Sequence, residues 1–67
     1  MEEGRSFEDA FLEEAVESRK PVKLFHTTGF QQEVTVIDYT FDAILALRSD
    51  GKRALIYRHG LSTIVME

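Results

Sequence analysis

The chain has 67 residues and no Cys, and its eight Lys and Arg face twelve Asp and Glu, for a net charge of −4. The length predicts one domain over residues 1–67, and the absence of Cys excludes disulfides. The acidic balance argues against broad, non-specific attraction to nucleic acid, which needs many basic side chains on phosphates, but it leaves room for a local basic site.

A domain of this size buries only a modest core, so it needs disulfides, a metal or partner subunits for stability. The two His, His26 and His59, lie far apart without ligand spacing, so we expect no metal and no cofactor. A homo-oligomer is the remaining source of burial. No apolar run of about 18 residues predicts a membrane span, and the N-terminus lacks a secretion signal. We expect a cytoplasmic protein, with which the missing Cys is compatible.

The chain begins with a polar stretch, residues 1–5, which we expect to be a mobile tail. A helix is predicted from Phe7 to Arg19, because apolar residues then recur at helical spacing. Ser6 is a suitable cap with Asp9 three residues later, and Pro21 ends the helix.

Beyond the helix the apolar pattern changes to a period of two. Five strands are predicted, at residues 22–27, 30–39, 43–48, 52–57 and 61–65. The second is long for a straight strand, so a bend or bulge is expected within it. Tight turns at Thr28-Gly29, Ser49-Asp50-Gly51 and Arg58-His59-Gly60 favour antiparallel hairpins. The prediction is a mainly β fold with one N-terminal helix and a five-stranded, strongly bent antiparallel open barrel, of OB-like, SH3-like or Sm-like type.

One motif near the C-terminus narrows this choice. Tyr57-Arg58-His59-Gly60, followed by the strand Leu61-Ser62-Thr63-Ile64-Val65, resembles the signature of the Hfq family, in which Tyr, Lys, His and a small residue precede an Ile-Ser-Thr strand. Further matches are Asp9, Phe11 and Leu12 in the helix, Pro21-Val22 at the first strand and Gly29 at its end. The resemblance implies an Sm-like fold. Residues 31–42 depart from the pattern, and either Phe41-Asp42 or Tyr39-Thr40 stands for the family's Phe-Asp pair.

The resemblance implies a ring, usually a hexamer, in which the last strand of one subunit pairs with the fourth strand of the next. It also implies binding of uridine-rich RNA around the pore on the helix-bearing face. The matching positions are Tyr57, Arg58, His59, Phe41, Ile44 and Glu8. Arg58 would contact phosphate or stack on a base, and Phe41 or Ile44 would stack or pack. His59 would hydrogen-bond to base edges, or else be a turn residue that is hydrogen-bonded within the subunit. Glu8 stands where the family commonly has Gln and would repel phosphate.

The opposite face of many Hfq rings binds adenine-rich RNA. The matching positions are Phe25, Gly29, Phe30, Gln31, Gln32 and Thr63. Phe25 and Phe30 could instead be core or interface residues. At the rim, where many family members carry an Arg-rich patch, residues 16–19 contain one basic side chain, Arg19. This predicts weak or absent RNA annealing by the rim.

No catalytic constellation is visible, and the chain is not expected to be an enzyme. Ser62 and His59 lack a third orienting group, and Asp38 and Asp42 are typical of exposed acids at strand ends. Two functions remain. One is a ring-forming RNA chaperone and post-transcriptional regulator that binds small RNAs and mRNA. The other is a divergent ring with weak RNA binding that serves as a structural or protein-interaction scaffold. The acidic net charge and the shortage of basic residues at the rim favour this second function.

Overall fold

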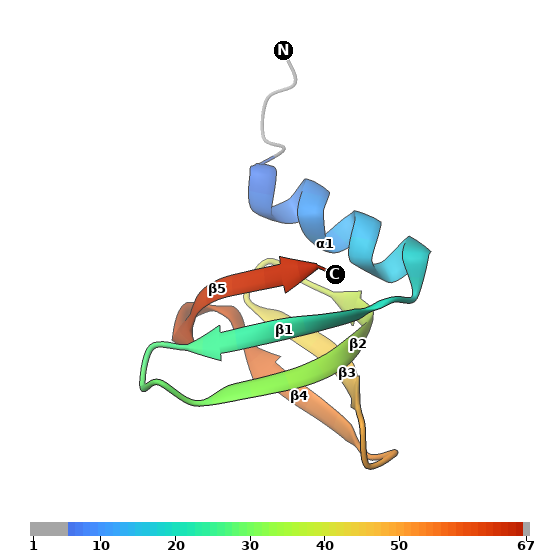
Figure 1. Cartoon of the computed structure of the whole chain (residues 1–67). Helices are drawn as coiled ribbons and strands as arrows, with labels where there is room; N and C mark the ends of the chain where they lie inside the picture. Colours follow the sequence, from blue (N-terminus) through green and yellow to red (C-terminus); the bar gives the residue numbers. More distant parts are fainter. Residues whose placement is uncertain (1–5, 67) are drawn as a thin grey trace.

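The computed structural model describes residues 6–66, so the predicted tail at residues 1–5 lies outside the described part. One helix precedes five strands, and a short 3-10 turn, η1, separates the last two (Figure 1). The elements are α1 (Phe7–Ser18), β1 (Pro21–His26), β2 (Gln31–Tyr39), β3 (Ala43–Arg48), β4 (Arg53–Tyr57), η1 (Arg58–Gly60) and β5 (Leu61–Met66). The predicted order of elements is therefore confirmed.

Local side-chain chemistry defines both ends of α1. At the start, the Ser6 Oγ accepts a hydrogen bond from the Asp9 amide at 3.0 Å, which satisfies one of the free N–H groups of the first turn. At the end, Arg19 has a left-handed backbone (φ 58°), and its amide donates to the Ala15 carbonyl. The sequence predicted Arg19 as the last helical residue. In the structure α1 ends at Ser18, and Arg19 is its C-terminal cap. The left-handed turn directs the chain into β1.

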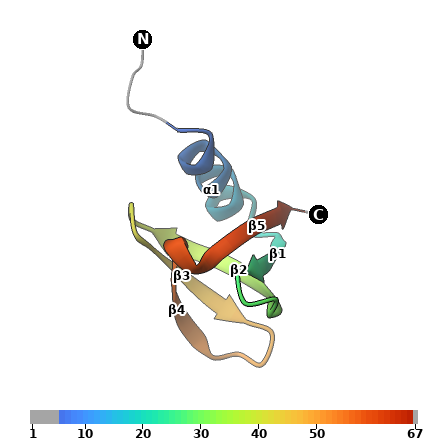
Figure 2. The same cartoon turned by 90° about the vertical axis from the view of Figure 1, so that its left-hand side faces the viewer.

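The five strands form one antiparallel sheet in the order β4-β3-β2-β1-β5. The register of β2 against β3 shifts between Val36 and Asp38, which leaves Ile37 without a partner. This bulge confirms the predicted irregularity in the long strand, and bulges of this kind increase the local bend. Figure 2 shows the resulting curvature of the sheet beneath α1. β4 and β5 are the two outer strands, so the sheet is open, and the predicted mainly β fold with one helix and five antiparallel strands is confirmed.

The core lies between α1 and the concave side of the sheet. Its buried members alternate along the strands, as the period of two predicts. They are Leu12, Ala15, Val22, Leu24, Val34, Val36, Ile44, Ala46 and Ile56. No helix within residues 6–66 has the length and apolar character needed to cross a bilayer.

The η1 turn is tied to two other loops. The Arg58 amide donates to the Asp42 carbonyl at 2.9 Å, and the Thr27 amide donates to the Gly60 carbonyl at 2.9 Å. These bonds fix η1 between the β2–β3 connection and the β1–β2 hairpin. The predicted turn motif therefore sits where three connections meet.

Candidate nucleic-acid interface

Arg58, the first residue of η1, anchors the N-terminus of α1 to the β2–β3 connection. Its Nε and Nη2 each donate to one carboxylate oxygen of Glu8, with the Nε–Oε2 distance 3.2 Å and the Nη2–Oε1 distance 2.9 Å. Nη2 also donates to Asp9 Oδ1 at 3.0 Å, and Nη1 donates to the Thr40 carbonyl at 2.6 Å. We call Arg58, Glu8, Asp9 and Thr40 the Arg58 network.

The Arg58 side chain is only 7% exposed, whereas those of Glu8 and Asp9 are 53% and 35% exposed. The hydrogen bond from Glu8 raises the pKa of the Arg58 guanidinium; burial acts in the opposite direction, and Asp9 adds to the increase. Arg58 is therefore cationic at neutral pH. One guanidinium faces two carboxylates, so the network has no excess of positive charge.

This geometry corrects the prediction made for Arg58 and shows how Glu8 is placed. Arg58 is not free to contact phosphate or to stack on a base, because its Nε, Nη1 and Nη2 atoms are all engaged within the fold. Glu8, which was expected to repel phosphate, accepts from Arg58 with both of its oxygens and remains 53% exposed. The sequence pattern carried no direct signal for this pairing, since Glu8 and Arg58 lie 50 positions apart.

Three other positions predicted on this side expose their rings around η1. The Tyr57 side chain is 55% exposed and Phe41 is 88% exposed, and His59 is exposed as well. The Tyr57 and His59 ring centroids lie 6.1 Å apart, with the ring planes inclined by 36°. We call Tyr57, His59 and Phe41 the aromatic rim of η1.

Ile44 does not belong to this rim. It is fully buried in the core, so of the two roles considered for it, stacking or packing, only packing fits. Its strand partner Tyr39 is packed against the same core, and the Tyr39 hydroxyl donates to Glu13 Oε1 at 2.7 Å. Tyr39, and not Phe41, is thus the packed aromatic residue before β3.

The positions predicted for the opposite face divide into two groups. Phe25 in β1 has Gln31 of β2 and Thr63 of β5 as its cross-strand partners, so these three side chains share one face of the sheet. Phe25 is half-buried, and the other two are exposed. We call Phe25, Gln31 and Thr63 the Phe25 face.

The second group lies on the other side of β1 and β2. Gln32 pairs with the buried Leu24, and its Nε2 lies 2.9 Å from His26 Nε2. Phe30 is 59% exposed, and its ring centroid lies 5.4 Å from that of His26. Gly29, with φ 98°, forms the turn between the two strands. Gln32 is therefore separated from Phe25. Gln32 and Phe30 both contact His26, for which no structural role was predicted from the sequence.

The residues considered for catalysis serve local structure. The Ser62 Oγ donates to the Phe25 carbonyl at 3.2 Å. Asp38 accepts from the Tyr39 amide, and Asp42 accepts from the Thr40 hydroxyl. Among residues 6–66, no three His, Asp or Glu side chains are grouped so that they could hold a metal ion. Arg19, the predicted rim residue, is exposed at the end of α1.

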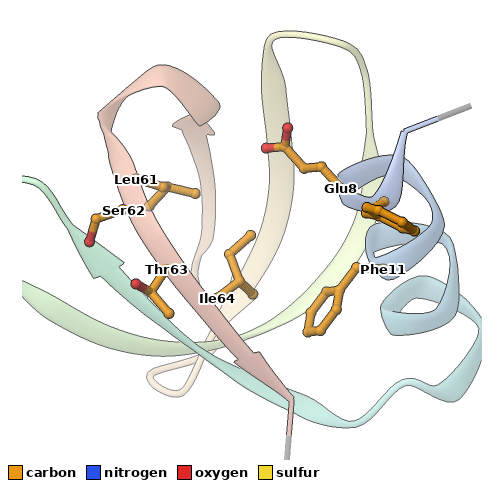
Figure 3. Close-up of a pocket in the computed structure, with 7 residues that line it drawn as sticks. Glu8, Phe11, Leu61, Ser62, Thr63 and Ile64 are labelled. Carbon is orange, nitrogen blue, oxygen red and sulfur yellow. The ribbon is translucent and has the colours of Figure 1, made fainter. Parts of the chain in front are cut away.

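A shallow groove of about 330 Å³ runs between the start of α1 and β5 (Figure 3). The helix contributes Phe7, Glu8 and Phe11, and β5 contributes Leu61 to Ile64. Phe7 is 97% exposed. The groove borders the outer edge of β5, which has no strand partner within residues 6–66.

Comparison with known proteins adds the family. The model of the Hfq protein family matches residues 7–67. The RNA-binding protein Hfq of Clostridium botulinum strain Eklund 17B is 36% identical over 62 residues, which are 92% of this chain and 79% of that protein. The RNA-binding protein Hfq of Clostridium acetobutylicum is 37% identical over 59 residues, 88% of this chain and 72% of that protein.

A solved structure agrees with the sequence relatives. The crystal structure of the pleiotropic translational regulator Hfq superposes with a TM-score of 0.85 at 28% identity, covering 91% of this chain and 100% of that chain. The names of these proteins describe RNA binding and regulation and not an enzyme, in agreement with the expectation from the sequence. By sequence and by fold, the chain belongs to the Hfq family.

Proposed function

We propose that this protein binds single-stranded RNA as a closed ring of identical subunits. The observation that carries the proposal is the position of the exposed Tyr57 and His59 on the turn leading into the open β5 edge. Joining subunits through this edge would gather one such pair from every copy around a common centre. The Clostridium relatives are named RNA-binding proteins, which supports the same function here.

The ring is supported by the two unpaired edges of the sheet. β4 of one copy and the β5 of the next can pair and continue the sheet, which would leave no open edge to aggregate. Apolar side chains accompany both edges, because Leu55 on β4 is 58% exposed and Val65 on β5 is 42% exposed. Burial of these side chains would add the stability that a chain of 67 residues needs from partners. Six subunits are expected from the family resemblance.

On the helix-bearing side, the proposed ligand is uridine-rich RNA at the aromatic rim of η1. Tyr57 and Phe41 offer ring faces for base stacking, worth about 1–3 kcal/mol per base. The His59 imidazole can donate to or accept from base edges. Arg58 supports this site from within the fold.

The Phe25 face is the second proposed RNA site, for adenine-rich sequences. Phe25, Gln31 and Thr63 lie side by side across three strands, so an aromatic surface is flanked by an amide and a hydroxyl that can bond to base edges. None of the three side chains is charged, which suits recognition of bases more than of phosphates.

The resulting role is that of a cytoplasmic RNA chaperone and post-transcriptional regulator acting on small RNAs and mRNA. The structure named for a pleiotropic translational regulator supports this assignment. The single rim cation, Arg19, supports the further expectation that annealing by the rim is weak.

Fluorescence titration of the intact protein with short uridine-rich and adenine-rich oligonucleotides, together with native mass spectrometry, tests the proposal. We expect a ring that binds both, with His59→Ala weakening only uridine-rich binding. Ser49→Ala, in an exposed turn, is the control. A ring that binds neither oligonucleotide at low salt would support the scaffold function instead, and a lone monomer would overturn the ring.

A further inference from the structure

We infer that Glu8 determines how the helix-bearing side recognises RNA, because it holds Arg58 away from phosphate and so leaves a site for bases. The inference rests on the proposed RNA-binding function and adds the chemistry of recognition to it. Arg58 becomes a positioning residue, and the aromatic rim of η1 makes the contacts.

The first support is the geometry of the pair. The two Glu8 oxygens accept from one edge of the Arg58 guanidinium: Oε2 from Nε at 3.2 Å and Oε1 from Nη2 at 2.9 Å. Arg makes this bidentate arrangement with carboxylates and phosphates alike. A phosphate would need the same donors, so Glu8 occupies the edge of the guanidinium that a phosphate would use.

The second support is exposure. The Arg58 side chain is 7% exposed beneath Glu8 and Asp9, which are 53% and 35% exposed. An approaching phosphate would therefore meet two carboxylates before the guanidinium. To swing outward, Arg58 would have to leave Glu8, Asp9 and the Thr40 carbonyl together.

The third support is what surrounds the network. Phe41 follows Thr40, whose carbonyl accepts from Arg58 Nη1 at 2.6 Å, so the guanidinium holds the backbone from which this exposed ring projects. Tyr57 and His59 flank Arg58 along the chain and expose their rings. The accessible groups are thus ring faces and an imidazole edge, which bind bases and depend little on salt.

The test is the salt dependence of binding to a fluorescein-labelled uridine hexamer, measured between 50 and 200 mM NaCl with the intact protein. Glu8→Gln removes the charge and leaves one oxygen to accept, which releases Arg58 donors. Glu14→Gln makes the same change of charge at an exposed position of the same helix and is the matched control. Glu8→Ala is a second release variant should Glu8→Gln fail to assemble.

We expect a shallow and equal slope of log affinity against log salt for the unaltered protein and Glu14→Gln. In Glu8→Gln the slope should steepen by about 0.7 for each Arg58 that gains a phosphate. This corresponds to an extra loss of affinity of about 2.6-fold between 50 and 200 mM NaCl. Binding at 50 mM should be tighter than in the unaltered protein. Adding Arg58→Gln to Glu8→Gln should remove the gain.

The outcomes separate this inference from the proposed function. If the protein binds the hexamer but Glu8→Gln and Glu14→Gln have the same slope, the inference is overturned while RNA binding stands. If only the Glu8 variants bind, Glu8 blocks RNA instead of leaving a site for bases, and both the inference and the uridine site of the unaltered protein are overturned. Absence of binding by all variants would overturn both.

Discussion

The Arg58 network and the Phe25 face use their polar groups in opposite ways. In the network a guanidinium, two carboxylates and a carbonyl satisfy one another across segments 50 residues apart in the chain. On the Phe25 face an aromatic ring, an amide and a hydroxyl stand in neighbouring strands and carry no charge. The first region holds elements together, while the second is the face proposed to offer its groups to RNA.

The difference shows that a motif residue can keep its place in a family signature and still act within the fold. Arg58 stands where a basic residue is expected beside His59, yet its side chain is the one charged group of residues 6–66 that is buried. In a chain with net charge −4, nearby carboxylates compete with phosphate for each cation. In the proposed function, RNA contacts are therefore left to aromatic and amide side chains.

The largest expected effect comes from breaking the network. Arg58→Ala leaves Glu8 and Asp9 facing each other and the Thr40 carbonyl without its donor, so we expect a loss of about 2 kcal/mol, reduced from the value of a fully buried pair because both carboxylates are partly exposed. Urea unfolding at fixed protein concentration measures it.

A matched control is available in another Arg. Arg48 pairs with Asp50 at 3.3 Å, with the two side chains 51% and 45% exposed, so Arg48→Ala should cost only about 0.5 kcal/mol. Equal losses in the two variants would show that the buried network is no more stabilising than a surface ion pair. Arg58→Lys should fall between them, because an ammonium cannot bond side-on to Glu8.

The Phe25 face is tested by removing its ring while keeping its bulk. Phe25→Leu retains apolar volume between Gln31 and Thr63 but loses the aromatic surface, so we expect adenine-rich binding to weaken by about 1–3 kcal/mol. Fluorescence anisotropy with adenine-rich and uridine-rich oligonucleotides measures the change. Uridine-rich binding should be unaffected, and equal weakening of both would merge the two proposed sites into one.

The sequence predicted the elements well because their signals are local. The period of two, Pro21 and the turn residues around Gly29 and Gly51 act within a few positions. The length of the second strand was enough to predict a bend or bulge within it but not its position at Ile37. The buried residues of the strands follow this alternation. Such features depend on neighbours in the chain and are visible without coordinates.

The candidate site was harder to predict because its groups meet only in three dimensions. The partners of Arg58 lie about 50 and 18 positions away, and no spacing rule links them. Likewise, the hairpin register decides that Gln31 and not Gln32 joins Phe25. A shift of one residue in that register would exchange the two side chains between faces.

A smaller effect is expected where α1 meets the sheet. Tyr39→Phe removes the hydroxyl that donates to Glu13 at 2.7 Å and lies 3.2 Å from the Asp9 carbonyl, while the ring stays packed. We expect a loss of about 1 kcal/mol in urea unfolding, the usual worth of one partly exposed hydrogen bond. Because the Arg58 network also holds α1, the double variant Tyr39→Phe with Arg58→Ala should lose less than the sum of the single changes. Strict additivity would mean that the two anchors act independently.

The smallest effect is expected at the rim, and it is a gain. Arg19 adopts a left-handed backbone at φ 58°, which costs a residue with a Cβ about 1 kcal/mol and glycine almost nothing. Arg19→Gly should raise the free energy of unfolding by about 0.5 kcal/mol, since the greater freedom of glycine in the unfolded chain offsets part of the relief. The same variant removes the one basic side chain of residues 16–19. Because a single cation contributes little, the rate of annealing of complementary RNAs should change by less than about twofold. A large loss of annealing would show that the rim acts through Arg19 alone, and RNA recognition would then extend to a third region beside the aromatic rim of η1 and the Phe25 face.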